Sequence, residues 1–355
     1  MKTFYCQVCG QMIFFDNAQC LRCGSQLGYL PDQFILSALE SCDESRWRSP
    51  DGSLYRKCAN TSTWQVCNWM IPAASSDQFC VSCSLNETIP DLSQPENLDS
   101  WRKLEQGKRR LVYNLQRLGL PVISKKVDPV GGLAFEFLKE LDAASEEERV
   151  RTGHINGTIT VNIVEADDLQ RELTRLNLNE AYRSILGHFR HESGHYYWWR
   201  FVNNSTLLEP FRALFGDERT DYKKSISAYY TKGPSPNWQS AYVSAYASSH
   251  PWEDWAECWS HYLTIIDALE TAQAHGVVLA RDHSRHLFTP TDSYRSESFD
   301  EMLEEWLPLT YAINSINRSA GQNDLYPFVL PGPAVNKLRF VHRVVKQGRS
   351  ESSPA

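Results

Sequence analysis

Apolar residues at helical spacing predict helices in three parts of the chain. From Leu98 to about Leu118, leucines at positions 104, 111 and 115 form one apolar face of a charged segment. Within this segment, Lys108-Arg109-Arg110 is expected to be a solvated face. The stretch from Asp167 to about Leu269 reads as helices joined by loops. A shorter amphipathic helix is expected from Pro31 to Leu39, with its proline near the start.

Two runs of apolar and β-branched residues predict strands, at 132–138 and 157–164. The dipeptide Asn156-Gly157 before the second run is typical of a tight turn between paired strands. Strands and helices together indicate a mixed α+β fold.

The composition is that of a globular protein, with 42% hydrophobic and 22% charged residues. The net charge is −7, and residues 1–90 also hold more acidic than basic side chains, so nucleic acid is an unlikely class of partner. The chain has no run of about eighteen apolar residues that would cross a membrane, and its start has no apolar stretch of about seven residues that a secretion signal needs. We therefore expect a cytoplasmic protein.

Nine of the ten cysteines lie within the first 83 residues. In a reduced compartment, this density favours metal binding over disulfides. Cys6, Cys9, Cys20 and Cys23 form two Cys-x2-Cys pairs, the spacing that lets two thiolates from one turn reach one tetrahedral ion. Four thiolates close the coordination sphere, so this set predicts a structural zinc ribbon.

A second structural zinc site is predicted from four later cysteines, Cys58, Cys67, Cys80 and Cys83. Cys42 is left over. It is expected to be a small buried side chain, although it could replace Cys58 as a ligand. Cys258, within a helical run, is expected to fill the core.

The segment His191-Glu192-Ser193-Gly194-His195 fits the pattern His-Glu-x-x-His. A capping box at Asn177 and Glu180 is expected to open a helix that continues past Trp199. On a helix, His191 and His195 project from one face and can bind one ion, while Glu192 can reach a water beside that ion without being a ligand. Gly194 suggests close packing of the helix beside the metal.

A third ligand is available 58 residues later, in the segment Pro251 to Glu257. Pro251 suits the first position of a helix, which places Glu253 in the first turn and Glu257 one turn further on. Two histidines, one glutamate and a water form a catalytic zinc arrangement, because the fourth position is open. Glu257 would accept the spare ring proton of a histidine ligand.

These residues carry a family resemblance. His-Glu-x-Gly-His followed by Tyr246-x6-Glu253-x3-Glu257 resembles the gluzincin metallopeptidases. The chain as a whole resembles a bacterial family of zinc-binding metallopeptidases with an N-terminal zinc ribbon. Besides the histidine motif, the matching segments are Cys58-Ala-Asn, Cys67-Asn-Trp, Tyr242 to Ser248, Pro251 to Glu257, and Asp324 to Phe328.

The resemblance implies a zincin-like fold, with zinc on His191, His195 and Glu253, Glu192 as general base, and Tyr246 near the oxyanion. The reaction would be hydrolysis of a peptide bond in a peptide or protein substrate. The strand around Thr158 to Ile163 is the candidate sheet edge on which an extended substrate could add. The competing hypothesis is a zinc-ribbon interaction or adaptor protein whose zincin-like half does not turn over substrate.

The expected organisation follows from these motifs. It comprises a zinc ribbon at 1–27, a second cysteine-rich zinc module at 28–90, a linker helix at 91–119, a zincin-like peptidase domain at 120–345 and a disordered tail at 346–355. The two zinc modules are expected to contact protein. The expected metal content is one catalytic and two structural zinc ions.

Overall fold

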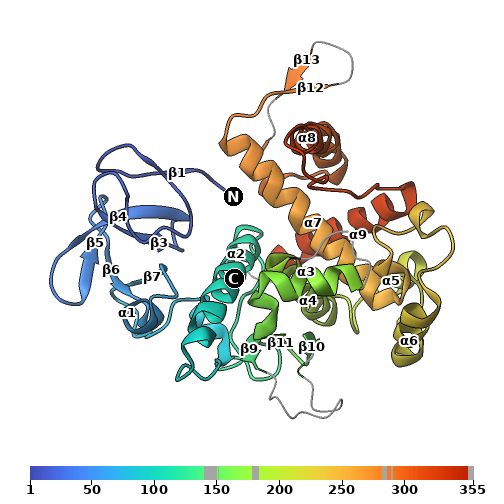
Figure 1. Cartoon of the computed structure of the whole chain (residues 1–355), viewed down its shortest axis with the longest axis horizontal. Coiled ribbons are helices and arrows are strands. Elements are labelled where there is room, and N and C mark those ends of the chain that lie inside the picture. The colour runs from blue at the N-terminus through green and yellow to red at the C-terminus, as the bar shows by residue number, and fades with distance from the viewer. Residues whose placement is uncertain (140–149, 151, 178–183, 282–285, 289–290, 351–355) are drawn as a thin grey trace. The chain divides into compact units, whose positions relative to one another are not determined.

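The computed structural model describes residues 1–139, 150, 152–177, 184–281, 286–288 and 291–350 (Figure 1). The chain forms two compact units. The N-terminal unit comprises Lys2–Tyr113 and Val122–Asp168, and the C-terminal unit comprises Met1, Asn114–Pro121 and Leu169–Ala355.

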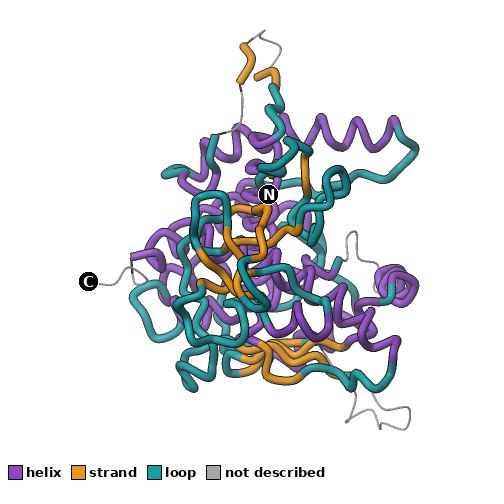
Figure 2. Tube along the Cα trace, turned by 90° about the vertical axis from the view of Figure 1, so that its left-hand side faces the viewer, coloured by secondary structure: helices purple, strands orange, loops and turns teal. Residues whose placement is uncertain are grey.

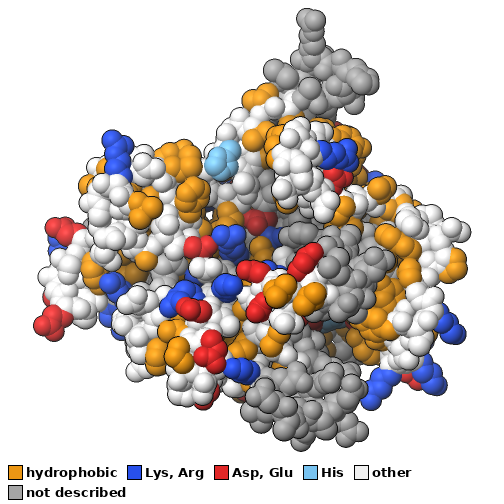
Figure 3. Space-filling model, in the orientation of Figure 1, with side chains coloured by type: hydrophobic (Ala, Val, Ile, Leu, Met, Phe, Trp, Pro, Cys, Tyr) orange, Lys and Arg blue, Asp and Glu red, His pale blue; other side chains and the backbone are white. Residues whose placement is uncertain are grey.

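Among the described residues, no helix combines the length and apolar character needed to cross a membrane. Charged side chains of both signs are intermixed on the face drawn in Figure 3.

Small antiparallel sheets make up the first part of the N-terminal unit. A short hairpin pairs β1 (Phe4–Tyr5) with β2 (Met12–Ile13). A five-stranded antiparallel sheet follows in chain order, formed by β3 (Gln26–Leu30), β4 (Ile35–Ser41), β5 (Arg46–Arg48), β6 (Leu54–Lys57) and β7 (Met70–Pro72), with helix α1 (Ala59–Trp64) between the last two strands. Leu30, Leu39, Tyr55 and Met70 form a core cluster in this sheet.

The helix predicted at 31–39 is wrong, because this segment is a tight turn followed by β4. Phe34 in the turn has φ 54°. Four successive residues of β4 are buried, Leu36 to Leu39, and a short run buried on both faces cannot be told from a helix by its apolar pattern. The Gln7 side chain bonds to the strand's backbone, accepting from Ala38 N at 2.7 Å and donating to Leu36 O at 3.2 Å.

The second sheet contains both predicted strands. Its order is β10 (Gly153–Ile155), β11 (Thr158–Asn162), β9 (Ala134–Leu138) and β8 (Asn86–Thr88), the last strand following a short 3-10 turn, η1 (Cys83–Leu85). Strand β11 is antiparallel to β10 and parallel to β9. Asn156 and Gly157 form the predicted turn, both with positive φ.

The predicted sheet edge at Thr158 to Ile163 is wrong. Strand β11 is paired on both sides, so β10 and β8 are the edges of this sheet as the structure describes it. Strand β10 gives no signal in the sequence, because its three residues are too few to show an alternating pattern.

The predicted long helix is confirmed as α2 (Pro95–Arg117), but its basic cluster is not a solvated face. Lys108 and Arg109 are buried, and only Arg110 of the three is exposed. Lys108 Nζ lies 2.7 Å from Glu105 Oε1, and Arg109 bonds to the carbonyl of Val66. Leu104, Leu111 and Leu115 are fully buried. The helix is therefore a core element, and the chain passes from one unit to the other within it.

Within the described residues the C-terminal unit is mainly helical, which confirms the helical reading for 167–177 and 184–269. Figure 2 draws the helices of the chain in purple. Its helices are α3 (Asp168–Asn177), α4 (Ile185–Phe201), α5 (Leu208–Phe215), α6 (Tyr222–Lys232), α7 (Pro251–Ala274), α8 (Phe299–Ser319) and α9 (Gly332–Ser350). Short 3-10 turns lie at η2 (Ile163–Ala166, in the N-terminal unit), η3 (Trp238–Ser240), η4 (Tyr246–Ser248) and η5 (Ser293–Arg295), and a hairpin pairs β12 (Leu279–Arg281) with β13 (His286–Phe288). Helix α7 packs against α4, α5, α8 and α9.

Two predicted boundaries in this unit are corrected. Asn177 ends α3 rather than opening the motif helix, which begins at Ile185 with Ser184 accepting a bond from Gly187 N at 3.0 Å. Glu180 of the expected capping box lies outside the described residues. The predicted tail is helical from Lys346 to Ser350, because Gly348 packs closely on Phe201, and residues 351–355 lie outside the described part.

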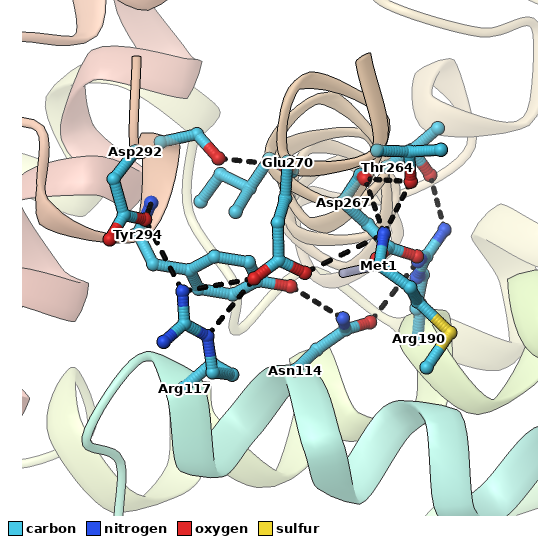
Figure 4. Close-up of polar contacts among 12 residues, drawn as sticks. Met1, Asn114, Arg117, Arg190, Thr264, Asp267, Glu270, Asp292 and Tyr294 are labelled. Carbon is cyan, nitrogen blue, oxygen red and sulfur yellow. Dashed lines mark hydrogen bonds and ion pairs between the residues drawn. The ribbon is translucent and has the colours of Figure 1, made fainter. Parts of the chain in front are cut away.

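An ion-pair network joins α4 to α7 within the C-terminal unit (Figure 4). Asp267 accepts bonds from Arg190 Nη2 at 2.7 Å and from the Met1 amino group at 2.9 Å. Arg190 also donates to Asn114 Oδ1 at 3.1 Å. Burial alone would raise the pKa of Asp267, but the positive charges of the Met1 amino group and Arg190 outweigh it and lower that pKa.

We expect Asp267→Asn to destabilise the protein by roughly 3 kcal/mol at pH 7, because it leaves positive charges without their buried partner. The lowered pKa of Asp267 means that its contribution is present above the ordinary aspartate value of about 3.9 and is lost as the pH falls through the folded-state value. The difference from wild type should therefore shrink below about pH 4. Urea unfolding curves at several pH values measure this difference in the free energy of unfolding. Asp300→Asn, which removes an exposed pair with Arg339, is the control, and equal losses in both variants would contradict the prediction.

Candidate metal centre

Helix α4 presents the two motif histidines on one face. The ring centroids of His191 and His195 lie 5.0 Å apart, and the two residues are one helical turn from each other. Gly194 between them lets α4 approach α7 closely, since a Cβ there would lie 3.0 Å from Ala256 Cα and 3.1 Å from Trp259 Cβ. Trp255 Nε1 donates to Gly194 O at 2.8 Å, so the packing is also fixed by a hydrogen bond.

Helix α7 begins where the sequence predicts and brings Glu253 to the histidines. Pro251 is its first residue, and the His250 side chain caps it by accepting from Trp252 N at 3.1 Å. Glu253 Oε2 lies 2.9 Å from His191 Nε2 and 3.6 Å from His195 Nε2. Each of the three residues offers one ligand atom, and these atoms lie within 4.8 Å of one another.

The charges of this cluster stabilise each other. Burial would lower the pKa of His191, but its hydrogen bonds with Glu253 and Glu257 and their charges outweigh burial and raise it well above its usual value. Burial would also raise the pKa of Glu253, yet His195 and His191 hold it well below the usual range. A carboxylate that is only 1% exposed thus stays ionised beside two imidazoles, and a cation could be held in the same place.

Glu257 lies on the far side of His191 from Glu253. Its Oε1 is 2.8 Å from His191 Nδ1, and its Oε2 accepts a bond from Ser244 Oγ at 2.6 Å. A carboxylate on Nδ1 fixes that nitrogen as the protonated one, which leaves the lone pair on Nε2. Ser244 lies within the family segment Tyr242 to Ser248, but nothing in the sequence predicts its contact with Glu257, thirteen residues later.

Tyr246 and Glu192 both lie near this cluster. Tyr246 begins η4, and its ring centroid is 6.0 Å from that of His191. Burial, followed by the charge of Glu253 and smaller effects that include Glu192, raises the pKa of Tyr246 well above its usual value. The phenol therefore keeps its proton and can donate it in a hydrogen bond. Glu192 is half-buried on α4 between the two histidines.

Tyr222, the first residue of α6, also belongs to the site. From the sequence, Asp221-Tyr222 reads as solvated or structural, with a substrate-facing role left open. The Tyr222 hydroxyl donates to Glu253 Oε1 at 2.9 Å. Burial and the charge and hydrogen bond of Glu253 raise its pKa, while a hydrogen bond with Tyr246 acts in the opposite direction. Asp221, which caps α6, signals the helix start but not this contact.

Other polar residues near the motifs serve the fold. Glu218 pairs with Arg212, with Arg212 Nε 2.9 Å from Glu218 Oε2. His261 Nδ1 lies 2.6 Å from the Tyr326 hydroxyl, and burial lowers the pKa of His261 to about 4.

Both predicted cysteine sets are assembled in the N-terminal unit. The sulfur atoms of Cys6, Cys9, Cys20 and Cys23 lie within 4.8 Å of one another, as do those of Cys58, Cys67, Cys80 and Cys83. Backbone N–H groups point at sulfur in the second set, from Trp69 to Cys67 at 3.3 Å and from Cys80 to Cys58 at 3.4 Å. Four converging sulfurs with such donors suit tetrahedral zinc.

Of the predictions for the two remaining cysteines, one is confirmed and the other is wrong. Cys258 is buried in α7, as predicted for core filling. Cys42 is exposed, so the expectation of a buried side chain is wrong. It directly follows β4, whose last two residues, Glu40 and Ser41, are exposed. Cys58, not Cys42, joins the second set.

Comparisons with known proteins agree with the cysteine sets and the histidine cluster. A family model described as "Putative zinc-binding metallo-peptidase" matches residues 97–344, and a zinc-ribbon domain model matches residues 3–94. Uncharacterized proteins of Mycobacterium bovis and of two strains of Mycobacterium tuberculosis are each 40% identical over 357 aligned positions, covering 100% of this chain and 98% of the relative. No solved structure matches. The chain therefore belongs to the family described as putative zinc-binding metallo-peptidases, with a zinc ribbon ahead of the peptidase region, as the resemblance in its sequence indicated.

Proposed function

We propose that the protein is a zinc-dependent peptidase of the gluzincin type, with a zincin-like catalytic region. The observation that supports this most directly is the convergence of His191, His195 and Glu253, with Glu192 on the same helix between the histidines. Two imidazoles and one carboxylate leave a position open on a tetrahedral ion, which distinguishes a catalytic zinc from a structural one.

The donor set fits zinc in type and orientation. Glu253 Oε2 faces both imidazoles, and Glu257 on His191 Nδ1 leaves Nε2 as the coordinating atom. A zinc ion held there would supply Lewis-acid chemistry, which acidifies water and polarises a carbonyl.

The surrounding residues would then carry out proton transfer and charge stabilisation. Glu192 takes a proton from the attacking water and delivers it to the leaving amine. The Tyr246 hydroxyl, which keeps its proton at neutral pH, donates a hydrogen bond to the developing oxyanion. Glu257 and Ser244 hold His191 in the required ring orientation.

The two cysteine sets are proposed to hold structural zinc. Each offers four sulfur ligands, which fill a tetrahedral sphere and leave no position for substrate. We propose that these modules contact protein, and that the peptidase acts in the cytoplasm on peptide or protein substrates.

The test is a proteomic comparison of new protein termini in cells that express the wild type or Glu192→Gln. Termini that appear only with the wild type would identify substrates. Identical sets of termini, at equal expression and zinc content, would overturn the peptidase and favour an adaptor whose zinc cluster does not turn over substrate.

Purified protein should contain three zinc ions per chain, one for each assembled cluster. A mild chelator should remove only the zinc of the histidine cluster, because an open position admits the competing ligand and a closed set of thiolates does not. Glu253→Ala removes one of three ligands and should release this zinc while both cysteine sites stay filled. Elemental analysis by mass spectrometry measures the zinc content of the untreated protein, of the chelator-treated protein and of Glu253→Ala. If Glu253→Ala holds its third zinc as tightly as the wild type, the ligand lies elsewhere and Glu257 is the first alternative.

A further inference from the structure

The two oxygens of the Glu253 carboxylate have different partners. Oε2 faces the coordinating nitrogens of His191 and His195, whereas Oε1 accepts the hydrogen bond from Tyr222 at 2.9 Å. Glu253 is only 1% exposed, so protein groups rather than bulk water surround the carboxylate. One oxygen of the carboxylate thus has a hydrogen-bond donor, and the other faces the two imidazoles.

Tyr222 is fixed by the start of the helix that carries Glu253. Its ring centroid lies 5.2 Å from that of His250 and 6.1 Å from that of Trp252, on either side of Pro251. His250 Nε2 also lies 3.0 Å from the carbonyl oxygen of Thr220, two residues before Tyr222. The ring contacts and the hydrogen bond tie the beginning of α6 to the beginning of α7, which fixes the direction of the hydroxyl.

Helix α6, which begins with Tyr222, lies at the surface and has no buried residue. Its side chains are exposed or half-buried, with Lys224 87% exposed, and Arg219 just before the helix is 69% exposed. Burial in a core therefore does not explain where the Tyr222 ring lies. Its contacts with His250, Trp252 and Glu253 do.

We propose that Tyr222 is a positioning residue of the zinc centre, which occupies Oε1 of Glu253 so that the metal is offered Oε2 alone. The proposal rests on the proposed function only in taking the histidine cluster as a zinc site. Binding through one oxygen matters because two histidines and one carboxylate oxygen leave a fourth position open. Without the hydroxyl, Oε1 is a buried carboxylate oxygen without its donor, which is costly unless it turns to the metal as a further ligand.

The experiment compares Tyr222→Phe with Tyr230→Phe in the full chain. Both remove a hydroxyl from α6 and keep the ring, and Tyr230 is 54% exposed. Zinc affinity of the histidine cluster is measured by competition with a chromophoric chelator, with the cysteine sites filled. We expect Tyr222→Phe to bind this zinc about 10- to 100-fold more weakly, the usual loss when the partner of a ligand is removed. Tyr230→Phe should match the wild type.

A second measurement reports ligand number directly. With Co²⁺ in place of the exchangeable zinc, four-coordinate metal absorbs visible light more strongly than five-coordinate metal. Tyr222→Phe should therefore lose absorption as Oε1 joins the metal, and Tyr230→Phe should not. A change in overall folding alone would not produce this difference while the far-ultraviolet circular dichroism stays constant.

Two results would overturn the proposal. One is zinc affinity and a Co²⁺ spectrum in Tyr222→Phe that equal those of the wild type. The other is a fall in kcat with unchanged zinc affinity, which would make Tyr222 a hydrogen-bond donor to substrate. Neither readout of metal binding needs peptide turnover. A wild type that holds the third zinc but hydrolyses nothing would therefore end the proposed function while leaving the metal measurements to decide on Tyr222.

Discussion

Replacing Glu192 with glutamine should lower peptide hydrolysis by about 10²- to 10⁴-fold, the usual contribution of a positioned general base. Glutamine keeps the size and polarity of the side chain but cannot take a proton from water. Zinc content should not change, because Glu192 lies beside the ligands His191 and His195 without being one in the proposed centre. Steady-state kinetics on a peptide from the terminal proteomics, together with metal analysis, measure both effects.

Glu301→Gln is a matched control for this variant, since Glu301 is an exposed residue in the first turn of α8. It should leave both turnover and zinc unchanged. Undiminished turnover in Glu192→Gln would exclude the proposed base. Loss of the third zinc in that variant would mean that Glu192 is a ligand, and the assignment of the cluster would then be wrong.

Tyr246→Phe should lower kcat by about 10²- to 10³-fold, the range for removal of one oxyanion donor. The ring remains, so its packing beside His191 and Tyr229 is kept. KM should change little, because a bond to the oxyanion forms mainly in the transition state. Zinc affinity should equal that of the wild type, which separates this variant from Tyr222→Phe. The measurement is a full kinetic curve with metal analysis on the same preparation.

Tyr311→Phe serves as the control for Tyr246→Phe, since Tyr311 is 67% exposed on α8. A fully active Tyr246→Phe would show that this phenol is not the oxyanion donor. Weaker zinc binding in Tyr246→Phe would instead indicate that the tyrosine supports the metal ligands.

The parts of the candidate site that the sequence predicted depend on local spacing. His191 and His195 are one helical turn apart, and Pro251 fixes the start of the helix that carries Glu253. Each Cys-x2-Cys pair is likewise a single turn. The two strands at β9 and β11 and the long helix α2 were predicted because each is long enough for its apolar period to show.

What the sequence did not predict depends on contacts between distant residues. Tyr222 reaches Glu253 across 31 positions, and no periodicity links them. Lys108 was read as solvated because a charged side chain on a helix usually is, but Glu105 and Asn86 provide it with buried partners. The pairing of β10 with β11, which removes the predicted edge, also depends on a partner strand rather than on the pattern of β11 itself.

The unequal exposure of the two cysteine sets has a consequence for the chemical durability of the protein. Cys23 of the first set is exposed and Cys9 half-buried, whereas all four cysteines of the second set are buried. Peroxide or an alkylating reagent in solution therefore meets the first set, along with exposed Cys42, well before the second. Oxidative ageing should proceed in stages. The ribbon near the start of the chain would lose its metal first, while the sulfurs around Cys58 remain protected by the fold.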